Sequence, residues 1–340
     1  MPRLSVGYQY NEDTPFPELV RRYRDRIEEV YFAWPDQPSG RSAVGNYDGY
    51  IDYHLQGDMM EELREIKAEN VKLNLLFNAN CYGDEAISKA LSGKVYSIID
   101  YLSDVGMRPD GITTTSPAIA FMVKERYENI DVKASVNMRI STVKGMKYVS
   151  HLFDSFCLAK ECNRELARLR ELKAFAEGCG KRITLLANSG CMRDCSGQIF
   201  HDNMVAHESG ISRRRNIDFM PYACWSYLKD PANHHTVLEN TWIRPEDIGR
   251  YEGICDTVKL ATRMHALPGM VIDAYARQSY RGNLLDLFEP GHGPAIAPYI
   301  VDNDRFPAGW FDKTAGCDKR CDSCGYCKEL WPTLTVKADM

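Results

Sequence analysis

Short apolar stretches rich in β-branched residues alternate along this chain with longer segments whose apolar residues recur at helical spacing. Helices are expected, for example, over 58–69, 87–105 and 163–177. Eight of the apolar stretches are expected to be strands: 4–8, 29–33, 72–78, 111–114, 131–136, 155–159, 182–187 and 257–260. Eight strand–helix repeats over about 260 residues predict a TIM-like (β/α)8 barrel. A doubly wound parallel sheet is the alternative.

The alternation stops over residues 189–240, which are rich in Cys, His, Asn and Arg. This segment is predicted to be a long insertion after the seventh strand, and a further short strand is expected near 241–243. In a barrel, a loop that follows a strand lies on the catalytic face. The insertion is therefore expected to contribute to the active site.

Glycine and proline mark a second change near the C-terminus. Residues 290–294 read Pro-Gly-His-Gly-Pro, with further prolines at 298 and 307, which is typical of an extended connector. The expected organisation is a barrel over 1–287, including the 189–240 insertion, followed by a connector and small cysteine module over 288–340.

Four cysteines stand close together in that module, as Cys317-x3-Cys321-x2-Cys324-x2-Cys327. One short segment that supplies four thiolates is similar to the wrapping of a [4Fe-4S] cluster, although no proline follows the last cysteine. Structural zinc sites usually draw on two separated Cys-x2-Cys pairs. An iron–sulfur cluster is the leading interpretation, zinc at this site is the alternative, and a disulfide knot is a third reading.

Composition indicates the cellular compartment and the class of partner. The chain has 12 Cys in 340 residues and a formal net charge of −5. No stretch is long and apolar enough for a membrane span or a secretory signal, so a cytoplasmic protein is expected, where thiols favour metal or redox chemistry over disulfides. The one basic run is Arg213-Arg214-Arg215, so nucleic acid is not an expected partner.

Five blocks of sequence, in order, resemble the collagenase-like U32 peptidase family. They are 74–78 (Asn-Leu-Leu-Phe-Asn), 134–138 (Ala-Ser-Val-Asn-Met), 158–161 (Leu-Ala-Lys-Glu), 185–191 (Leu-Leu-Ala-Asn-Ser-Gly-Cys, with Cys195 and His201 beyond) and 256–263 (Asp-Thr-Val-Lys-Leu-Ala-Thr-Arg). Despite the peptidase label, the resemblance implies an iron–sulfur protein on a barrel. Such members take part in oxygen-independent hydroxylation of ubiquinone precursors or of bases in transfer and ribosomal RNA.

The resemblance also implies that Cys191, Cys195 and Cys224 hold a mid-chain cluster. A fourth family cysteine has no counterpart over 242–248, so either one iron is open to substrate or Cys81, after the third expected strand, completes the set. The four C-terminal cysteines would hold a second cluster.

The remaining site candidates end or follow expected strands. Asn78, Asn137 and Glu161 should rim the pocket, where Glu161 would act as a general acid or base, or else form an ion pair with a neighbouring Lys or Arg. His201 would transfer a proton or bond a cluster sulfide, or else be structural. Two residues that match the family signature stretch, Lys259 and Arg263, would bind a carboxylate-bearing substrate at the pocket mouth.

The leading hypothesis is an iron–sulfur enzyme that carries out oxygen-independent hydroxylation, or a related redox or dehydration step, on a small anionic molecule, with an electron donor or a related subunit as partner. Three alternatives remain: a factor that hydroxylates RNA bases, a peptidase, and a non-catalytic electron-transfer subunit. The sequence contains neither a Gly-x-Ser-x-Gly elbow nor a His-Glu-x-x-His motif, either of which would favour the peptidase.

Overall fold

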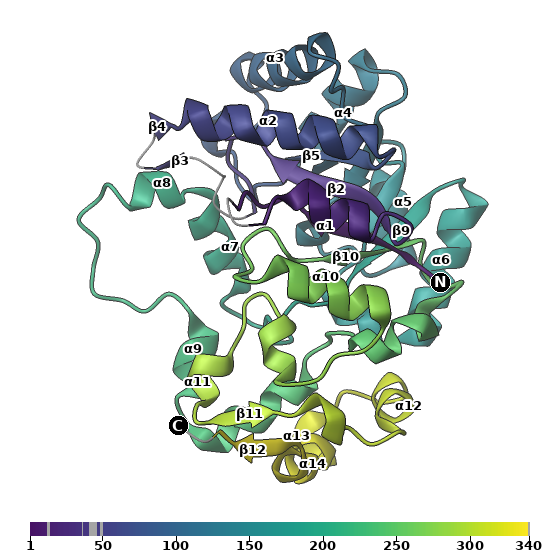
Figure 1. Cartoon of the computed structure of the whole chain (residues 1–340), viewed down its shortest axis with the longest axis vertical. Coiled ribbons are helices and arrows are strands. Elements are labelled where there is room, and N and C mark those ends of the chain that lie inside the picture. Colours follow the sequence, from purple (N-terminus) through teal and green to yellow (C-terminus); the bar gives the residue numbers. More distant parts are fainter. Residues whose placement is uncertain (12–13, 36, 41–45, 48–49, 339–340) are drawn as a thin grey trace.

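Eight parallel strands close into a barrel in the computed structural model of this chain, which describes residues 1–11, 14–35, 37–40, 46–47 and 50–338 (Figure 1). Neighbouring strands follow one another in the sequence, and the last pairs with the first through Ser5 and Lys259. The strands are β1 (Arg3–Gly7), β2 (Ile27–Ala33), β5 (Lys72–Phe77), β6 (Gly111–Thr114), β7 (Asp131–Ala134), β8 (Ser155–Cys157), β9 (Arg182–Leu186) and β10 (Thr257–Leu260). The predicted (β/α)8 barrel is confirmed, and the eight expected strands are those observed.

Helices cover the outside of this barrel (Figure 1). Among them, α2 (Tyr53–Ala68) and α3 (Lys89–Asp104) begin at a residue whose side chain caps free backbone N–H groups: the Asp52 carboxylate accepts from the backbone at the start of α2, and the Ser88 hydroxyl does so for α3. The covering helices are α1 (Phe16–Arg22), α2 (Tyr53–Ala68), α3 (Lys89–Asp104), α4 (Pro117–Arg126), α5 (Val143–Val149), α6 (Leu166–Gly178) and α10 (Pro268–Arg277). The short strands β3 (Asn46–Tyr47) and β4 (Tyr50–Ile51) form a separate antiparallel pair.

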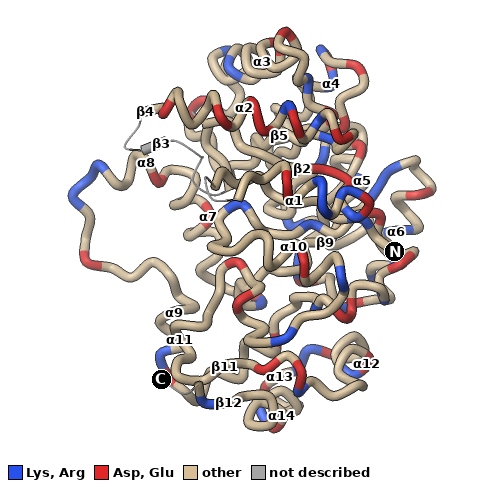
Figure 2. Tube along the Cα trace, viewed as in Figure 1, with Lys and Arg blue, Asp and Glu red and all other residues tan. Residues whose placement is uncertain are grey.

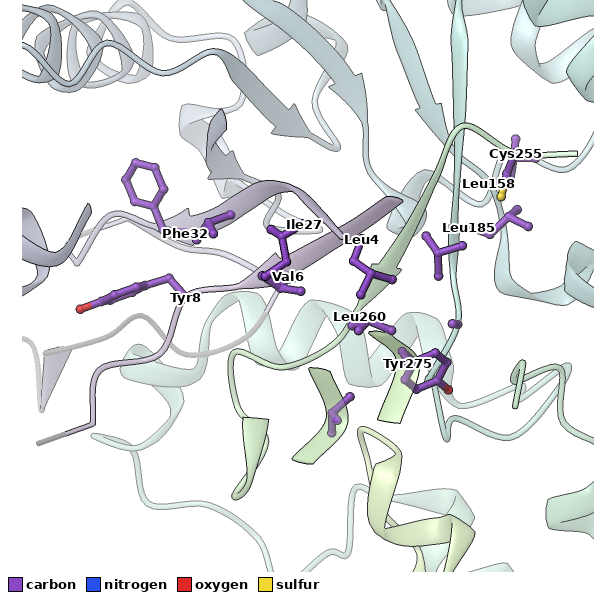
Figure 3. Packing of buried hydrophobic residues seen from close by; sticks show 14 of the residues in the cluster. Leu4, Val6, Tyr8, Ile27, Phe32, Leu158, Leu185, Cys255, Leu260 and Tyr275 are labelled. Carbon is purple, nitrogen blue, oxygen red and sulfur yellow. The ribbon is translucent and has the colours of Figure 1, made fainter. Parts of the chain in front are cut away.

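Apolar side chains lie on the outer face of the barrel wall, and mainly polar side chains lie on its inner face. Leu4 and Val6 of β1 are fully buried and pack near Ile27 and Leu260 (Figure 3). Because side chains alternate along a strand, Ser5 lies on the opposite face, where its hydroxyl bonds Glu29 inside the barrel. The apolar layer stabilises the barrel and leaves its interior to polar residues.

The predicted insertion after the seventh strand is also confirmed. β9 ends at Leu186, and the chain then forms α7 (Gln198–Ala206), α8 (Glu208–Ile211), α9 (Ala223–Leu228), η4 (Pro231–Glu239) and η5 (Pro245–Tyr251) before β10. The prediction of a short strand near 241–243 was wrong. This stretch is irregular, and the Ile243 N–H donates a single hydrogen bond to the Ala187 carbonyl where a strand would form a ladder of such bonds.

The C-terminal segment contains η6 (Leu284–Leu287), α11 (Gly293–Ile296), β11 (Tyr299–Val301), η7 (Asn303–Arg305), α12 (Trp310–Ala315), α13 (Cys321–Cys324), α14 (Tyr326–Leu334) and β12 (Thr335–Lys337). β11, within the expected connector, pairs antiparallel with β12 near the end of the chain. The buried Trp310 ring stacks on Trp242 of the insertion at 5.9 Å, and the Arg164 guanidinium lies over both rings. The segment therefore packs directly on the insertion; the domain division at residue 288 stays a prediction.

Charges are interspersed along the chain, with a run of positive charge in the loop after α8, at Arg213-Arg214-Arg215 (Figure 2). These three arginines are exposed. In the described part of the chain, no helix combines the length and apolar character needed to cross a membrane.

Candidate active site and metal centres

A buried ion pair forms the floor of the barrel interior. Lys133 of β7 lies 2.6 Å from the Glu29 carboxylate of β2, which also accepts bonds from Ser5 and Asn74. Burial opposes charge on Glu29, but Lys133 and these hydrogen bonds outweigh it and lower its pKa to about 2. Both members of the pair therefore remain charged at neutral pH, beneath the pocket described next.

Lys259 of β10 also lies inside the barrel and, unlike this pair, lines the pocket. Its Nζ is 3.8 Å from the centre of the Tyr31 ring, whose hydroxyl donates to the Leu260 carbonyl. Burial lowers the pKa of Lys259 to about 8. Gly7 makes room for this arrangement, because a Cβ there would approach the Tyr31 ring to 2.7 Å. The lysine was expected at the pocket mouth but lies inside the barrel.

A pocket with about 620 Å³ of empty space opens above Lys259, which we call the mouth pocket. Four side chains singled out from the sequence line it together: Asn78, Asn137, Lys259 and Arg263. Leu76, Val136, Leu186 and Met264 add an apolar lining. Two cations and two amides against an apolar wall suit a small carboxylate-bearing molecule.

A second cavity of about 770 Å³ lies beside the insertion, and we call it the cysteine pocket. Its lining includes His201, Tyr222, Cys224 and Trp225, and the His201 ring meets Tyr222 edge-on at 5.0 Å. Met264 and Glu289 line both this cavity and the mouth pocket. The two spaces therefore adjoin, which puts Cys224 next to the entrance of the barrel.

The start of the insertion is fixed by two residues after β9. The fully buried Asn188 side chain donates to the carbonyls of Ala261 and Leu287 and accepts from the Ala261 N–H at 2.6 Å. Gly190 lies so close to the C-terminal connector that a Cβ would come within 2.0 Å of the Pro290 oxygen. These contacts hold Cys191 against residues 288–290.

Cys224 lies near the other two mid-chain cysteines, Cys191 and Cys195. All are partly buried. Burial raises the pKa of the Cys224 thiol, and the neighbouring Cys191 and Cys195 raise it further. Cys81, the suggested fourth ligand, lies after β5, and its Sγ accepts the Gly83 N–H of its own turn at 3.3 Å.

The C-terminal cysteines are similarly grouped. Burial raises the pKa of Cys327 to about 12, and the neighbouring Cys321 and Cys317 raise it as well. Gly325, with a φ of +71°, reverses the chain between α13 and α14. Cys324 is exposed at the end of α13.

One arginine connects the two cysteine groups. Arg193, between Cys191 and Cys195 in sequence, donates from Nη2 to Cys321 Sγ at 3.3 Å and to the Lys319 carbonyl. Its backbone N–H donates to the Asn240 side chain. The two groups thus lie near each other, although 126 residues separate Arg193 from Lys319.

Within the described ranges, no three His, Cys, Asp or Glu side chains have the arrangement that holds a metal ion. The donor chemistry nevertheless fits a soft metal or a cluster, because each group combines neighbouring thiols, most of them partly buried, and the C-terminal group also has adjacent N–H donors. The Cys317 sulfur, for instance, accepts the Lys319 N–H at 3.3 Å.

Glu161 lines neither the mouth pocket nor the cysteine pocket. Its carboxylate is 2.6 Å from the Lys160 ammonium, the ion pair that was the alternative to a catalytic role. The residues missed in the sequence are Glu29, Lys133, Tyr31, Met264 and Glu289. An ionisable residue within a short apolar strand was the available signal for the first two; nothing local marked the others.

Comparison with known proteins fits this architecture. No protein-family model matches the chain. It is 23% identical over 324 residues to a protein named uncharacterized protease MJ1657 of Methanocaldococcus jannaschii, covering 94% of this chain and 92% of that one. Its fold is similar to that of the U32 peptidase Mk0906, with a TM-score of 0.53 and 14% identity over 76% of this chain and 92% of the other. The similarity along nearly the whole sequence and the fold shared with a U32 peptidase agree with the expected resemblance to the U32 peptidase family.

Proposed function

We propose that this protein is an iron–sulfur enzyme that acts on a small anionic molecule bound in the mouth pocket. The main support for the proposal is that the two pockets adjoin. The mouth pocket contains Lys259 and Arg263, the cysteine pocket contains Cys224, and Met264 and Glu289 border both. A bound anion would therefore lie close to the mid-chain cysteines.

Substrate binding is the part that the chain's own side chains perform. Lys259 and Arg263 attract a carboxylate or similar anion, and the amides of Asn78 and Asn137 supply hydrogen bonds that orient it. The apolar residues around them exclude water and strengthen these contacts. This arrangement favours a compact molecule with an apolar body and one anionic group.

In this proposal, Cys191, Cys195 and Cys224 hold a [4Fe-4S] cluster, and the four C-terminal cysteines hold a second cluster or, as the alternative, zinc. Such clusters supply one-electron transfer, and an iron without a protein ligand also acts as a Lewis acid. Arg193, which lies between Cys191 and Cys195 in sequence, donates to Cys321 and so links the two groups.

The reaction class is oxygen-independent hydroxylation or a related redox or dehydration step. Hydroxylation with water as oxygen donor converts R–H and H2O to R–OH and releases two protons and two electrons, so it requires an external electron acceptor. A dehydration requires none. His201 lies in the cysteine pocket, where its imidazole can accept or return a proton.

Electron paramagnetic resonance (EPR) of anaerobically purified, reduced protein tests this function. Benzoate serves as the probe because it combines one carboxylate with an apolar body. The expected result is a cluster signal that changes when benzoate is added and no longer changes in Lys259→Met. If benzoate binds and the signal stays the same, a non-catalytic electron-transfer subunit is the better account.

Peptidase activity is the second candidate, favoured by the name of the relative and by one feature of the cysteine pocket. His201 and Cys224 both line it, and a thiol beside an imidazole is the pair that cysteine peptidases use. Metal-free protein that cleaves unfolded casein, and loses that activity in both Cys224→Ser and His201→Ala, would establish this candidate in place of the first.

A further inference from the structure

A histidine of the C-terminal connector lies between the two segments that carry the mid-chain cysteines. His292 is 2% exposed, and its Nε2 is 3.0 Å from the carbonyl oxygen of Gly190, the residue before Cys191. Its ring meets Trp225, the residue after Cys224, edge-on at 6.0 Å. Helix α9, which contains Cys224 and Trp225, packs with α11, which begins directly after His292 (Figure 1). His292 is thus adjacent in space to both cysteine segments.

The hydrogen bond to Gly190 determines the state of the imidazole. A carbonyl oxygen only accepts, so Nε2 carries the proton and donates it. In the neutral ring, Nδ1 then presents a bare lone pair. This atom is buried and has no hydrogen-bond partner within the described part of the chain. Leaving such a buried polar atom unsatisfied is unfavourable, and a bound ligand would offset this cost.

The same arrangement is typical of histidines that bind metals. One ring nitrogen donates to a backbone carbonyl, which fixes the orientation of the ring, and the other nitrogen binds the metal. His265 shows the contrast, since it is also buried but both of its nitrogens are satisfied, by the Asp286 carbonyl and the Leu267 N–H.

We propose that His292 is the fourth protein ligand of the mid-chain cluster, binding iron through Nδ1 beside Cys191, Cys195 and Cys224. This inference rests on the proposed function, because it requires the cluster. The fourth ligand would then come from the connector, in place of Cys81 or of an iron left open to substrate. All four irons would then have protein ligands, so the cluster would transfer electrons while the substrate remains in the mouth pocket.

Pulsed EPR of the reduced, anaerobically purified full-length protein tests the assignment. A nitrogen bound directly to iron gives a strong hyperfine coupling, and replacing ¹⁴N-histidine by ¹⁵N-histidine alters that coupling in the wild-type protein without any substitution. We expect the coupling in wild type, its loss in His292→Ala and His292→Cys, and its retention in the control His265→Ala.

The variants also distinguish a ligand from a structural residue. His292→Cys should keep its iron and sulfide but show a lower midpoint potential, because thiolate replaces imidazole, whereas His292→Ala should lose iron. A wild-type cluster signal without histidine coupling would overturn the role of His292 alone. Wild-type protein without iron and sulfide would instead overturn the proposed function, and this assignment with it.

Discussion

At the scale of single residues, the barrel interior contains two lysines in contrasting settings. Lys133 is paired with Glu29 at 2.6 Å, whereas Lys259 lies against the Tyr31 ring and lines the mouth pocket. The attraction of Glu29 outweighs the burial of Lys133 and raises its pKa, while burial lowers the pKa of Lys259 to about 8. Lys133 therefore maintains the structure, and Lys259 is the cation available to a ligand.

This difference predicts a pH dependence of anion binding. The Lys259 ammonium is charged below pH 8 and loses its proton above it, whereas benzoate remains an anion throughout. The affinity for benzoate should therefore fall by about tenfold between pH 7 and pH 9, as measured by isothermal titration calorimetry. Lys259→Arg, which stays charged, should bind with little change over this range. Equal affinity of the wild type at both pH values would contradict this role of Lys259.

At the scale of elements, the end of β9 and the connector meet in a tightly constrained junction. Ser189 and Glu289 form a parallel bridge, and the Gly190 N–H donates to the Glu289 carbonyl. The missing side chain of Gly190 permits this approach, because a Cβ would lie 2.0 Å from the Pro290 oxygen. Both cavities border this junction through Glu289.

Gly190→Ala should therefore separate the two segments. We expect a loss of about 3 kcal/mol in the free energy of unfolding, measured by urea denaturation, together with reduced iron content. Gly93→Ala is the matched control: Gly93 lies within α3 with nothing near its Cβ position, so alanine should stabilise the protein by about 0.5–1 kcal/mol. Similar stability of Gly190→Ala and wild type would refute the constraint.

The sequence predicted the helices and strands better than it predicted the contacts between loops that are far apart in the chain. The eight strands were recognisable because each is a short apolar stretch followed by a helical pattern. Asn78 and Asn137 were expected near the mouth because strand ends converge there, whereas Lys259 and Arg263 were expected there from the resemblance to the family signature stretch. Glu29 and Lys133 were missed, although an ionisable residue inside such a strand requires a partner. Met264 and Glu289 could not be recognised, because their importance comes from loops that meet only in three dimensions.

At the scale of the whole molecule, the C-terminal segment shares the core of the barrel and insertion. Trp310 stacks on Trp242, and both rings contact Arg164, which follows β8. Residues on either side of position 288 belong to a single buried cluster. The C-terminal cysteines are thereby held close to Arg193 and the mid-chain group.

This shared core predicts cooperative unfolding. Urea transitions of metal-free protein followed by far-ultraviolet circular dichroism and by tryptophan fluorescence should coincide. Trp310→Ala should shift both transitions together and cost about 3–5 kcal/mol. Two separate transitions, with only the fluorescence one affected by the substitution, would instead indicate that 288–340 is an independent module.

The central claim is that the mid-chain cysteines beside the mouth pocket hold an iron–sulfur cluster. Its most direct test is the iron and acid-labile sulfide content of anaerobically purified protein. Wild type should contain two clusters, and two serine variants should contain one each: Cys191, Cys195 and Cys224 replaced together, and Cys317, Cys321, Cys324 and Cys327 replaced together. If the mid-chain variant has as much iron and sulfide as wild type, the claim is wrong.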